Sequence, residues 1–197
     1  IQPTVVELFQ ADDYFSGEQL DNLWWIKKVN ADKYQQQLQQ TTKVKVWVID
    51  SWVDKNHQDL NWNVNETDGY NFIDDNTDTT DGNWHGSQVA WVIWAKVNWS
   101  WVFWVNSNAD LVPLKILNNQ WIGSSYDLLE AINYSKEKWN KVLNISLWWY
   151  WDPSTDPICQ AITDAKNVWI TTVVAAWNNN WDVSSIVPAW CSDAITV

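Results

Sequence analysis

The chain has 197 residues, a formal net charge of −12 and a pI near 4.3, and hydrophobic residues make up 46% of it. This length predicts one domain with a sizeable core, and the acidic balance argues against a nucleic-acid partner because phosphate binding needs clustered lysine and arginine. No apolar run is long enough to cross a bilayer, and nothing at Ile1 resembles a signal peptide. We therefore expect no membrane partner. Any signal peptide is expected to have been removed or never to have existed.

Two features of the composition are unusual. The chain contains 20 tryptophans but only 5 glycines, with neither methionine nor arginine, whereas average usage places glycine at about 7% of residues. A domain of this size needs glycine wherever the backbone takes a positive φ, and a bulky residue there is an outlier. Cys159 and Cys191 are the only cysteines, and the sequence leaves open whether they form a disulfide or remain two free thiols.

Strand-like and helix-like stretches alternate along most of the chain. Residues 1–42 are polar and irregular, and we expect a surface N-terminal arm with at most a short helix. Residues 43–197 are then expected to form the folded domain. Its β-branched and amphipathic stretches predict, in chain order, strand 43–50, strand 68–72, loop 76–83, helix 87–97, strand 110–117, helix 124–139, strand 141–147, helix 156–168, strand 170–176 and a strand from 194. Asp156 and Pro157 suit the N-cap and first position of the last of these helices.

Strands that alternate with helices of this length predict an α/β fold, a doubly wound, mostly parallel sheet with helices on both faces. In such sheets the chemistry lies beyond the carboxyl ends of the strands. Asp50 closes the strand 43–50 and Asn178 follows the strand 170–176, so both are candidate site residues. Each has a plainer interpretation, because an acid at a strand end can be a cap and an asparagine after a strand is often a turn former.

Four short motifs resemble those of a known family. "VIDSW" (48–52), "HGSQVAW" (85–91), "NISLWW" (144–149) and "VVAAWNNN" (173–180) resemble V-I-D-[ST]-G, H-G-[ST]-x-V-A-G, N-[MI]-S-L-G-G and V-V-A-A-G-N of the subtilisin-like serine proteases. The motifs occur in the family's order and near its spacing, and the resemblance covers nearly the whole chain from Asp12 onward. It implies a subtilisin-like fold, with 43–197 as the N-terminal two-thirds of a catalytic domain.

The resemblance implies catalytic roles for three residues. Asp50 is similar to the buried carboxylate that orients the histidine, His85 to the general base, and Asn178 to the side-chain amide that stabilises the oxyanion. We expect the other histidine, His57, to be a solvated turn or helix residue. The family's nucleophilic serine belongs to a segment beyond Val197, and no serine of this chain lies in its motif. This fragment alone is therefore expected to be inactive.

The resemblance also implies substrate and metal sites. The two extended segments that hold the family's peptide substrate, through backbone hydrogen bonds, correspond here to Ser146, Leu147, Trp148, Trp121 and Gly123. Calcium prefers about six to eight oxygen ligands. Two oxygen-rich sets resemble the family's calcium sites. The first is Asn71, Asp74, Asn76, Asp78 and Thr80 in one loop, and the second is Asp59 and Asn98 with the carbonyls near Lys96, Ser100 and Val102. Such acidic loops can also be simply solvated.

The main departure from the family concerns its glycines. Tryptophan stands at family glycine positions, namely Trp52, Trp84, Trp91, Trp148, Trp149 and Trp177, with Trp101, Trp104 and Trp121 as further cases. Several such indoles are expected to overpack the fold, at about 1–3 kcal/mol each, against a total stability of roughly 5–15 kcal/mol. Either the true protein does not carry these tryptophans, or the chain was redesigned. We favour the first interpretation, which an intact mass would test.

Together these features predict a secreted serine endopeptidase that hydrolyses peptide bonds through a Ser-His-Asp acyl-enzyme mechanism, with its serine outside this chain. Its partners would be polypeptide substrates and a propeptide or protein inhibitor, its cofactor structural Ca²⁺, and its state a monomer. The alternative is a catalytically inactive subtilisin-like module that binds calcium and a partner protein. The residue at the family's serine position distinguishes the two.

Overall fold

The computed structural model describes residues 28–31, 43–78, 82–94, 105–106, 108–138, 140–150, 156–176, 178 and 182–197. Of the expected arm, only 28–31 are described, so the boundary at residue 42 stays a prediction. The labelled elements in chain order are β1 (Val44–Asp50), β2 (Tyr70–Asn71), α4 (His85–Ile93), β3 (Ala109–Lys115), α5 (Ser125–Glu137), β4 (Val142–Ile145), β5 (Trp149–Tyr150), α6 (Pro157–Asn167), β6 (Thr171–Val174), β7 (Ile186–Val187) and β8 (Ile195–Thr196).

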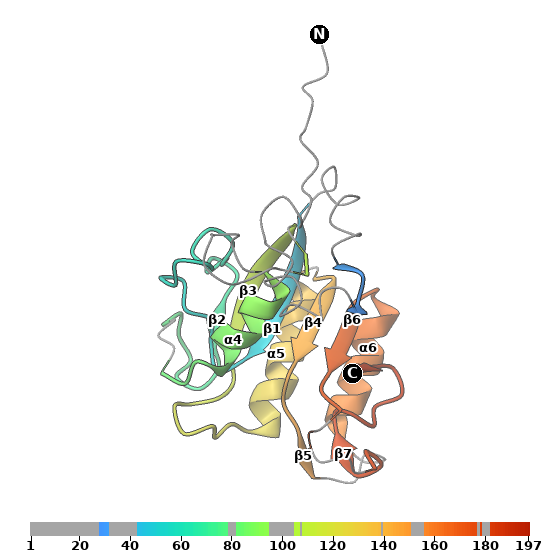
Figure 1. Ribbon diagram of the computed structural model, residues 1–197. Helices are drawn as coiled ribbons and strands as arrows, with labels where there is room; N and C mark the ends of the chain where they lie inside the picture. The colour runs from blue at the N-terminus through green and yellow to red at the C-terminus, as the bar shows by residue number, and fades with distance from the viewer. Residues whose placement is uncertain are drawn as a thin grey trace.

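The main sheet contains six parallel strands in the order β2-β3-β1-β4-β6-β8 (Figure 1). β1 pairs with β3 from Val44 opposite Ala109 to Asp50 opposite Lys115, and with β4 on its other side. The chain adds β3 and β2 on one side of β1 and β4, β6 and β8 on the other. The end of β1 is therefore the switch point at which sheets of this kind bind ligands.

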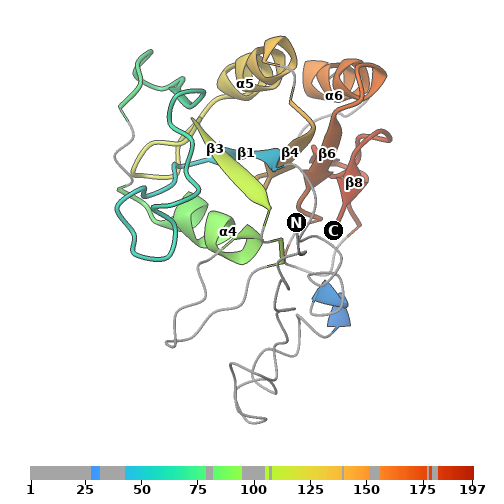
Figure 2. The ribbon, with the colours of Figure 1, turned by 90° about the horizontal axis from the view of Figure 1, so that it is seen from above.

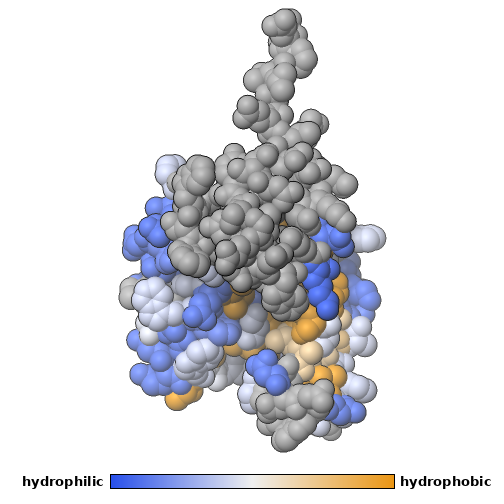
Figure 3. All heavy atoms as spheres, viewed as in Figure 1, coloured by the Kyte–Doolittle hydropathy of each residue, from blue (hydrophilic) through white to orange (hydrophobic). Residues whose placement is uncertain are grey.

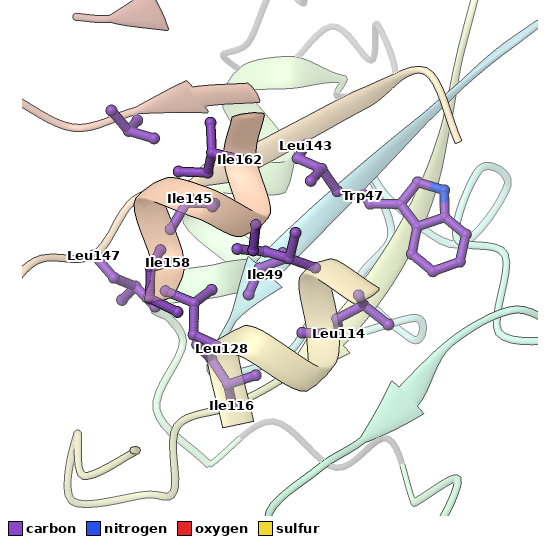
Figure 4. Close-up of a cluster of buried hydrophobic side chains, with 14 of the residues drawn as sticks. Trp47, Ile49, Leu114, Ile116, Leu128, Leu143, Ile145, Leu147, Ile158 and Ile162 are labelled. Atoms are coloured by element: carbon purple, nitrogen blue, oxygen red, sulfur yellow. The ribbon is translucent and has the colours of Figure 1, made fainter. Parts of the chain in front are cut away.

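Helices cover both faces of the sheet, as predicted. Figure 2 shows α4 on one face and α5 and α6 together on the other. Side chains of β1 alternate between two cores: Val46 and Val48 pack with Ala90 of α4, whereas Trp47 and Ile49 pack in the larger core beneath α5 and α6 (Figure 4). This period of two, with both faces buried, explains the continuous apolar run in the sequence.

Local signals set the helix starts on the α5 and α6 face. Ser124 forms a capping box with Asp127 at the start of α5, which satisfies two backbone N–H groups that a helix leaves unpaired. At the start of α6, Asp156 accepts a hydrogen bond from the Ile158 backbone N–H at 2.8 Å, and a proline follows it. The prediction for the start of α6 is confirmed.

A disulfide joins α6 to the segment that follows β7. Cys159 and Cys191 are bonded, with their Cα atoms 5.0 Å apart. Cys191 is buried in the larger core, and Cys159 packs against it. Of the two alternatives that the sequence left open, the structure therefore has the bonded pair.

Four short elements differ from expectation. α4 begins at His85, two residues before the predicted start, and β2 has two residues instead of five. The antiparallel pair of Trp149–Tyr150 with Ile186–Val187 was not predicted, because two-residue strands leave no alternating pattern.

Polar side chains spread over the β2 flank of the molecule in Figure 3, while apolar residues gather nearer the carboxyl ends of β4 and β6. Within the described part of the chain, no helix has the length and apolar character needed to span a membrane.

Candidate functional site

A buried carboxylate and a histidine meet at the end of β1. The imidazole Nδ1 of His85 lies 2.7 Å and 2.8 Å from the two carboxylate oxygens of Asp50. The Asp50 side chain is fully buried, whereas about a quarter of the His85 side chain is exposed. A buried carboxylate needs such a partner, because an unpaired charge in the interior is costly. The resemblance assigned these two residues to one catalytic site, and the structure places them in direct contact.

The start of α4 is tied to the end of β1 by hydrogen bonds on both sides of His85. The backbone N–H of Gly86 donates to the Ser51 hydroxyl at 3.1 Å, and the Asp54 backbone N–H donates to the Ser87 hydroxyl at 2.8 Å. The Ser51 backbone N–H also donates to the Asp50 carboxylate at 2.6 Å. These contacts fix the helix against the strand, and with it the orientation of the imidazole ring. Sequence reasoning did not identify Ser51 or Ser87 in this role.

The geometry of the pair determines what the imidazole can do. A neutral ring that donates its Nδ1–H to Asp50 presents Nε2 as the nitrogen that can accept a proton. When Nε2 accepts one, the carboxylate stabilises the imidazolium that results. The arrangement is therefore suited to general-base chemistry at the exposed edge of the ring.

A cavity of about 760 Å³ opens beside His85. Its walls come from the segment after β3, the segment after β4 and the end of β6. The predicted residues that line it are His85, Trp121, Gly123, Ser146, Leu147, Trp148 and Asn178. The structure thus gathers the predicted substrate segments and the predicted oxyanion residue around one cavity. It is further lined by Ile116, Leu117, Ser124, Ser125, Trp149 and Ala175, which sequence reasoning had not assigned to the site.

Indole rings form part of this cavity. The Trp121 ring contacts His85 edge-on, with ring centroids 4.7 Å apart and an interplanar angle of 63°. Trp121 and Trp148 both line the cavity and are exposed, so each places a bulky side chain on its wall. The cleft is therefore narrower than glycine at these positions would leave it.

Most of the second predicted calcium set lies outside the described residues, namely Lys96, Asn98, Ser100 and Val102. Its remaining member, Asp59, is buried, and its carboxylate accepts the Trp91 indole N–H at 3.2 Å. His57 lies half-buried in the turns that follow β1, where its Nδ1 accepts the Asp59 backbone N–H at 3.2 Å.

The first predicted calcium loop is described except for Thr80. Asp74, Asn76 and Asp78 lie close together, but the group at their centre is the side-chain amide nitrogen of Asn71. An N–H group donates hydrogen bonds and cannot ligate a cation. The donor set in this arrangement therefore does not fit calcium. Within the described residues, no three acids, cysteines or histidines form a group that could hold a metal ion.

The site is therefore a buried Asp–His pair at the switch point of a parallel sheet, beside a cavity of about 760 Å³. Comparison with known proteins identifies the family. The subtilase family profile matches residues 41–197, and the chain belongs to the subtilase family.

Named relatives include subtilisin DY of Bacillus licheniformis, which is 32% identical over 155 residues, covering 78% of this chain and 54% of the relative. A cuticle-degrading serine protease of Arthrobotrys oligospora is 28% identical over 92% of this chain and 45% of its own length. Thermitase of Thermoactinomyces vulgaris is 27% identical over 94% of this chain and 63% of its own length. The chain thus spans about half the length of the first two of these relatives.

Solved structures show the same fold. A cold-adapted subtilisin-like serine proteinase superposes with a TM-score of 0.69 at 25% identity, covering 79% of this chain and 54% of the other. A lanthipeptide protease superposes with a TM-score of 0.76 at 22% identity, covering 92% and 56%. The prediction of a subtilisin-like α/β fold is confirmed.

Proposed function

We propose that this chain carries the aspartate, the histidine and the oxyanion donor of a secreted serine endopeptidase whose nucleophilic serine lies outside residues 1–197. The observation that carries the proposal is the contact of His85 Nδ1 with both oxygens of buried Asp50, beside the cavity that Asn178 also lines. Family membership supports the same reaction class.

The proposed reaction is an acyl transfer in which each residue has a defined task. His85 Nε2 takes the proton of the serine hydroxyl as the oxygen attacks the peptide carbonyl, and returns it to the leaving amine. Asp50 holds the ring by Nδ1 and stabilises the imidazolium. The side-chain amide of Asn178 donates a hydrogen bond to the oxyanion. Water then hydrolyses the acyl-enzyme by the same proton transfers.

The proposed substrate is a polypeptide in extended conformation. It would lie between 121–123 and 146–148, both of which contribute residues to the cavity lining, and add backbone hydrogen bonds to both. A propeptide or protein inhibitor would use the same cleft.

Secretion is supported by the Cys159–Cys191 disulfide, since such bonds persist in oxidising compartments. We further propose a monomer, and structural calcium at the set that includes the buried carboxylate of Asp59.

Labelling by a fluorophosphonate tests the proposal on the full-length product of the gene that encodes this chain. We expect a serine adduct on the folded protein and cleavage of a protein substrate. His85→Ala should lower kcat/KM by about 10²–10⁴-fold, while His57→Ala, which changes the other histidine, should leave it unchanged. A folded full-length protein that neither labels nor cleaves would instead identify the inactive calcium-binding module.

A further inference from the structure

The loop 71–78 has an amide nitrogen at the point where its oxygens converge. The Asn71 Nδ2 lies 3.1 Å from the Asp74 Oδ2, 3.4 Å from the Asn76 Oδ1 and 3.3 Å from the Asp78 backbone oxygen. These three oxygens come from the residues that the resemblance had assigned as calcium ligands. The centre of the set is therefore occupied by a hydrogen-bond donor that belongs to the chain itself.

The orientation of this amide is fixed by its other end. The Asn71 Oδ1 accepts the backbone N–H groups of Ile73 at 3.0 Å and Asp74 at 3.2 Å. Backbone nitrogens only donate, so the atom facing them must be the oxygen, and the NH₂ group must face the opposite way. Asn71 is also buried, so turning the amide over would leave two backbone donors facing a third donor in a place that water scarcely reaches.

The loop is closed by other contacts that need no ion. The backbones of Asn71 and Asn76 exchange two hydrogen bonds, at 2.9 Å and 3.1 Å. Lys115, a buried residue at the end of β3, lines the same hollow as Asp74 and Asp78. The loop is thus closed by hydrogen bonds within the chain itself.

We propose that the Asn71 amide takes the place of a cation in this loop, so that 71–78 holds its fold without calcium. One atom decides this property. Aspartate at position 71 would keep the oxygen that accepts from Ile73 and Asp74, and would present a second oxygen where the NH₂ now lies. The same loop would then offer an oxygen set suited to calcium.

The substitution Asn71→Asp tests this directly. By isothermal titration calorimetry we expect the variant to bind one calcium ion more than the parent chain. The Tm of the variant should rise by about 5 °C or more in calcium at roughly 100 times the Kd. The Tm of the parent chain should rise less, because its loop binds no ion. Asn76→Asp is the matched control, because it adds the same charge to the same loop and leaves the Asn71 donor in place. It should add no calcium ion.

A calcium ion held at the Asp59 set would be common to all these chains and cancels in the comparison. The proposal is overturned if Asn71→Asp gains no calcium ion. It is also overturned if Asp74→Asn in the parent loses one, since the parent loop would then hold calcium. The Asp74→Asn result decides the question even if Asn71→Asp fails to fold.

Discussion

Tryptophan and glycine lie two residues apart both at the start of α4 and in the segment after β3, and the two residue types fit their positions very differently. A Cβ on Gly86 would lie 2.0 Å from the Trp52 backbone oxygen, and one on Gly123 would lie 2.0 Å from the Ile116 backbone oxygen. Neither glycine has a positive φ. These glycines are needed for space, because another strand or turn passes too close for any side chain.

The tryptophans two residues earlier occupy positions that call for glycine for another reason. Trp84 has a φ of 73° and Trp121 a φ of 65°, in the left-handed region that costs an ordinary residue about 1–2 kcal/mol. Trp169, at the end of α6, has a φ of 65° as well. The chain thus has glycine where close packing requires it and tryptophan where backbone conformation favours glycine.

The largest effect expected from this comparison follows Gly86→Ala. The added methyl group would overlap a backbone oxygen that cannot rotate away, so α4 must shift relative to β1. We expect the free energy of unfolding to fall by roughly 3 kcal/mol, which corresponds to a Tm lower by about 10 °C in thermal unfolding. The shift should also weaken the contact of His85 with Asp50.

Gly82→Ala is the matched control for this substitution. Its Cβ would meet the Asn119 side chain, and that side chain can move. We expect a loss below about 1 kcal/mol. Equal losses for the two variants would show that the approach of Trp52 to Gly86 does not limit the fold.

A smaller effect of opposite sign is expected from Trp169→Gly. The backbone N–H groups of Trp169 and Ile170 donate to the carbonyls of Lys166 and Ala165 at 2.9 Å and 3.0 Å, which is a Schellman motif with the left-handed residue at Trp169. The Trp169 side chain is 84% exposed, so little packing is lost with it. We expect the free energy of unfolding to rise by about 1 kcal/mol and the Tm to rise by roughly 2–4 °C.

Trp190→Gly provides the opposite case, since Trp190 is exposed but has no positive φ. Glycine there only raises the conformational entropy of the unfolded chain, so the free energy of unfolding should fall by about 0.5–1 kcal/mol. If both variants are destabilised, the left-handed conformation at Trp169 costs less than glycine's added freedom.

The same conformations bear on what the natural protein contains. Four tryptophans have a positive φ, which glycine adopts readily, and one of them is Trp52 with a φ of 153°. The buried indole N–H of Trp52 also has no acceptor among the described residues. These observations favour the interpretation that the natural residues are glycines. A gene in which UGA codons, read here as tryptophan, encode glycine would give this pattern. Peptide masses of protein purified from its source should then be lower, at each such position, by the difference between the two residues.

Much of the fold could be predicted because its signals are local. The run 43–50 alternates between two cores, and Asp156 caps its helix through its own side chain. The early start of α4 could not be predicted, because its N-cap is Trp84, which makes no side-chain cap bond. The contact of Asp50 with His85 was implied by the resemblance of their motifs to those of the subtilisin-like proteases. The Asn71 amide could not be placed, because sequence does not show which end of an amide faces the loop.

The smallest effect concerns the ion pair that holds the same end of α6. Asp193, beside β8, accepts hydrogen bonds from the Lys166 ammonium and, at 2.8 Å, from the Thr163 hydroxyl. The bond from Lys166 lowers the pKa of Asp193 most, followed by that from Thr163. A carboxyl whose pKa is lower in the folded state stabilises the fold fully above its unfolded pKa, about 3.9. That stabilisation is lost as the pH falls through the folded-state pKa.

Asp193→Asn should therefore lower Tm slightly at pH 7, with a difference from the parent that shrinks as the pH falls below about 4. Salt should reduce the difference at pH 7, because the Lys166 side chain is exposed. Thermal unfolding from pH 7 to pH 2 measures both trends. In the Trp169→Gly background the Asp193 effect should be unchanged if conformation and charge act on the helix end independently. A larger Tm change on Asp193→Asn in the parent chain than in the Trp169→Gly background would mean that the ion pair compensates for the strained backbone at Trp169.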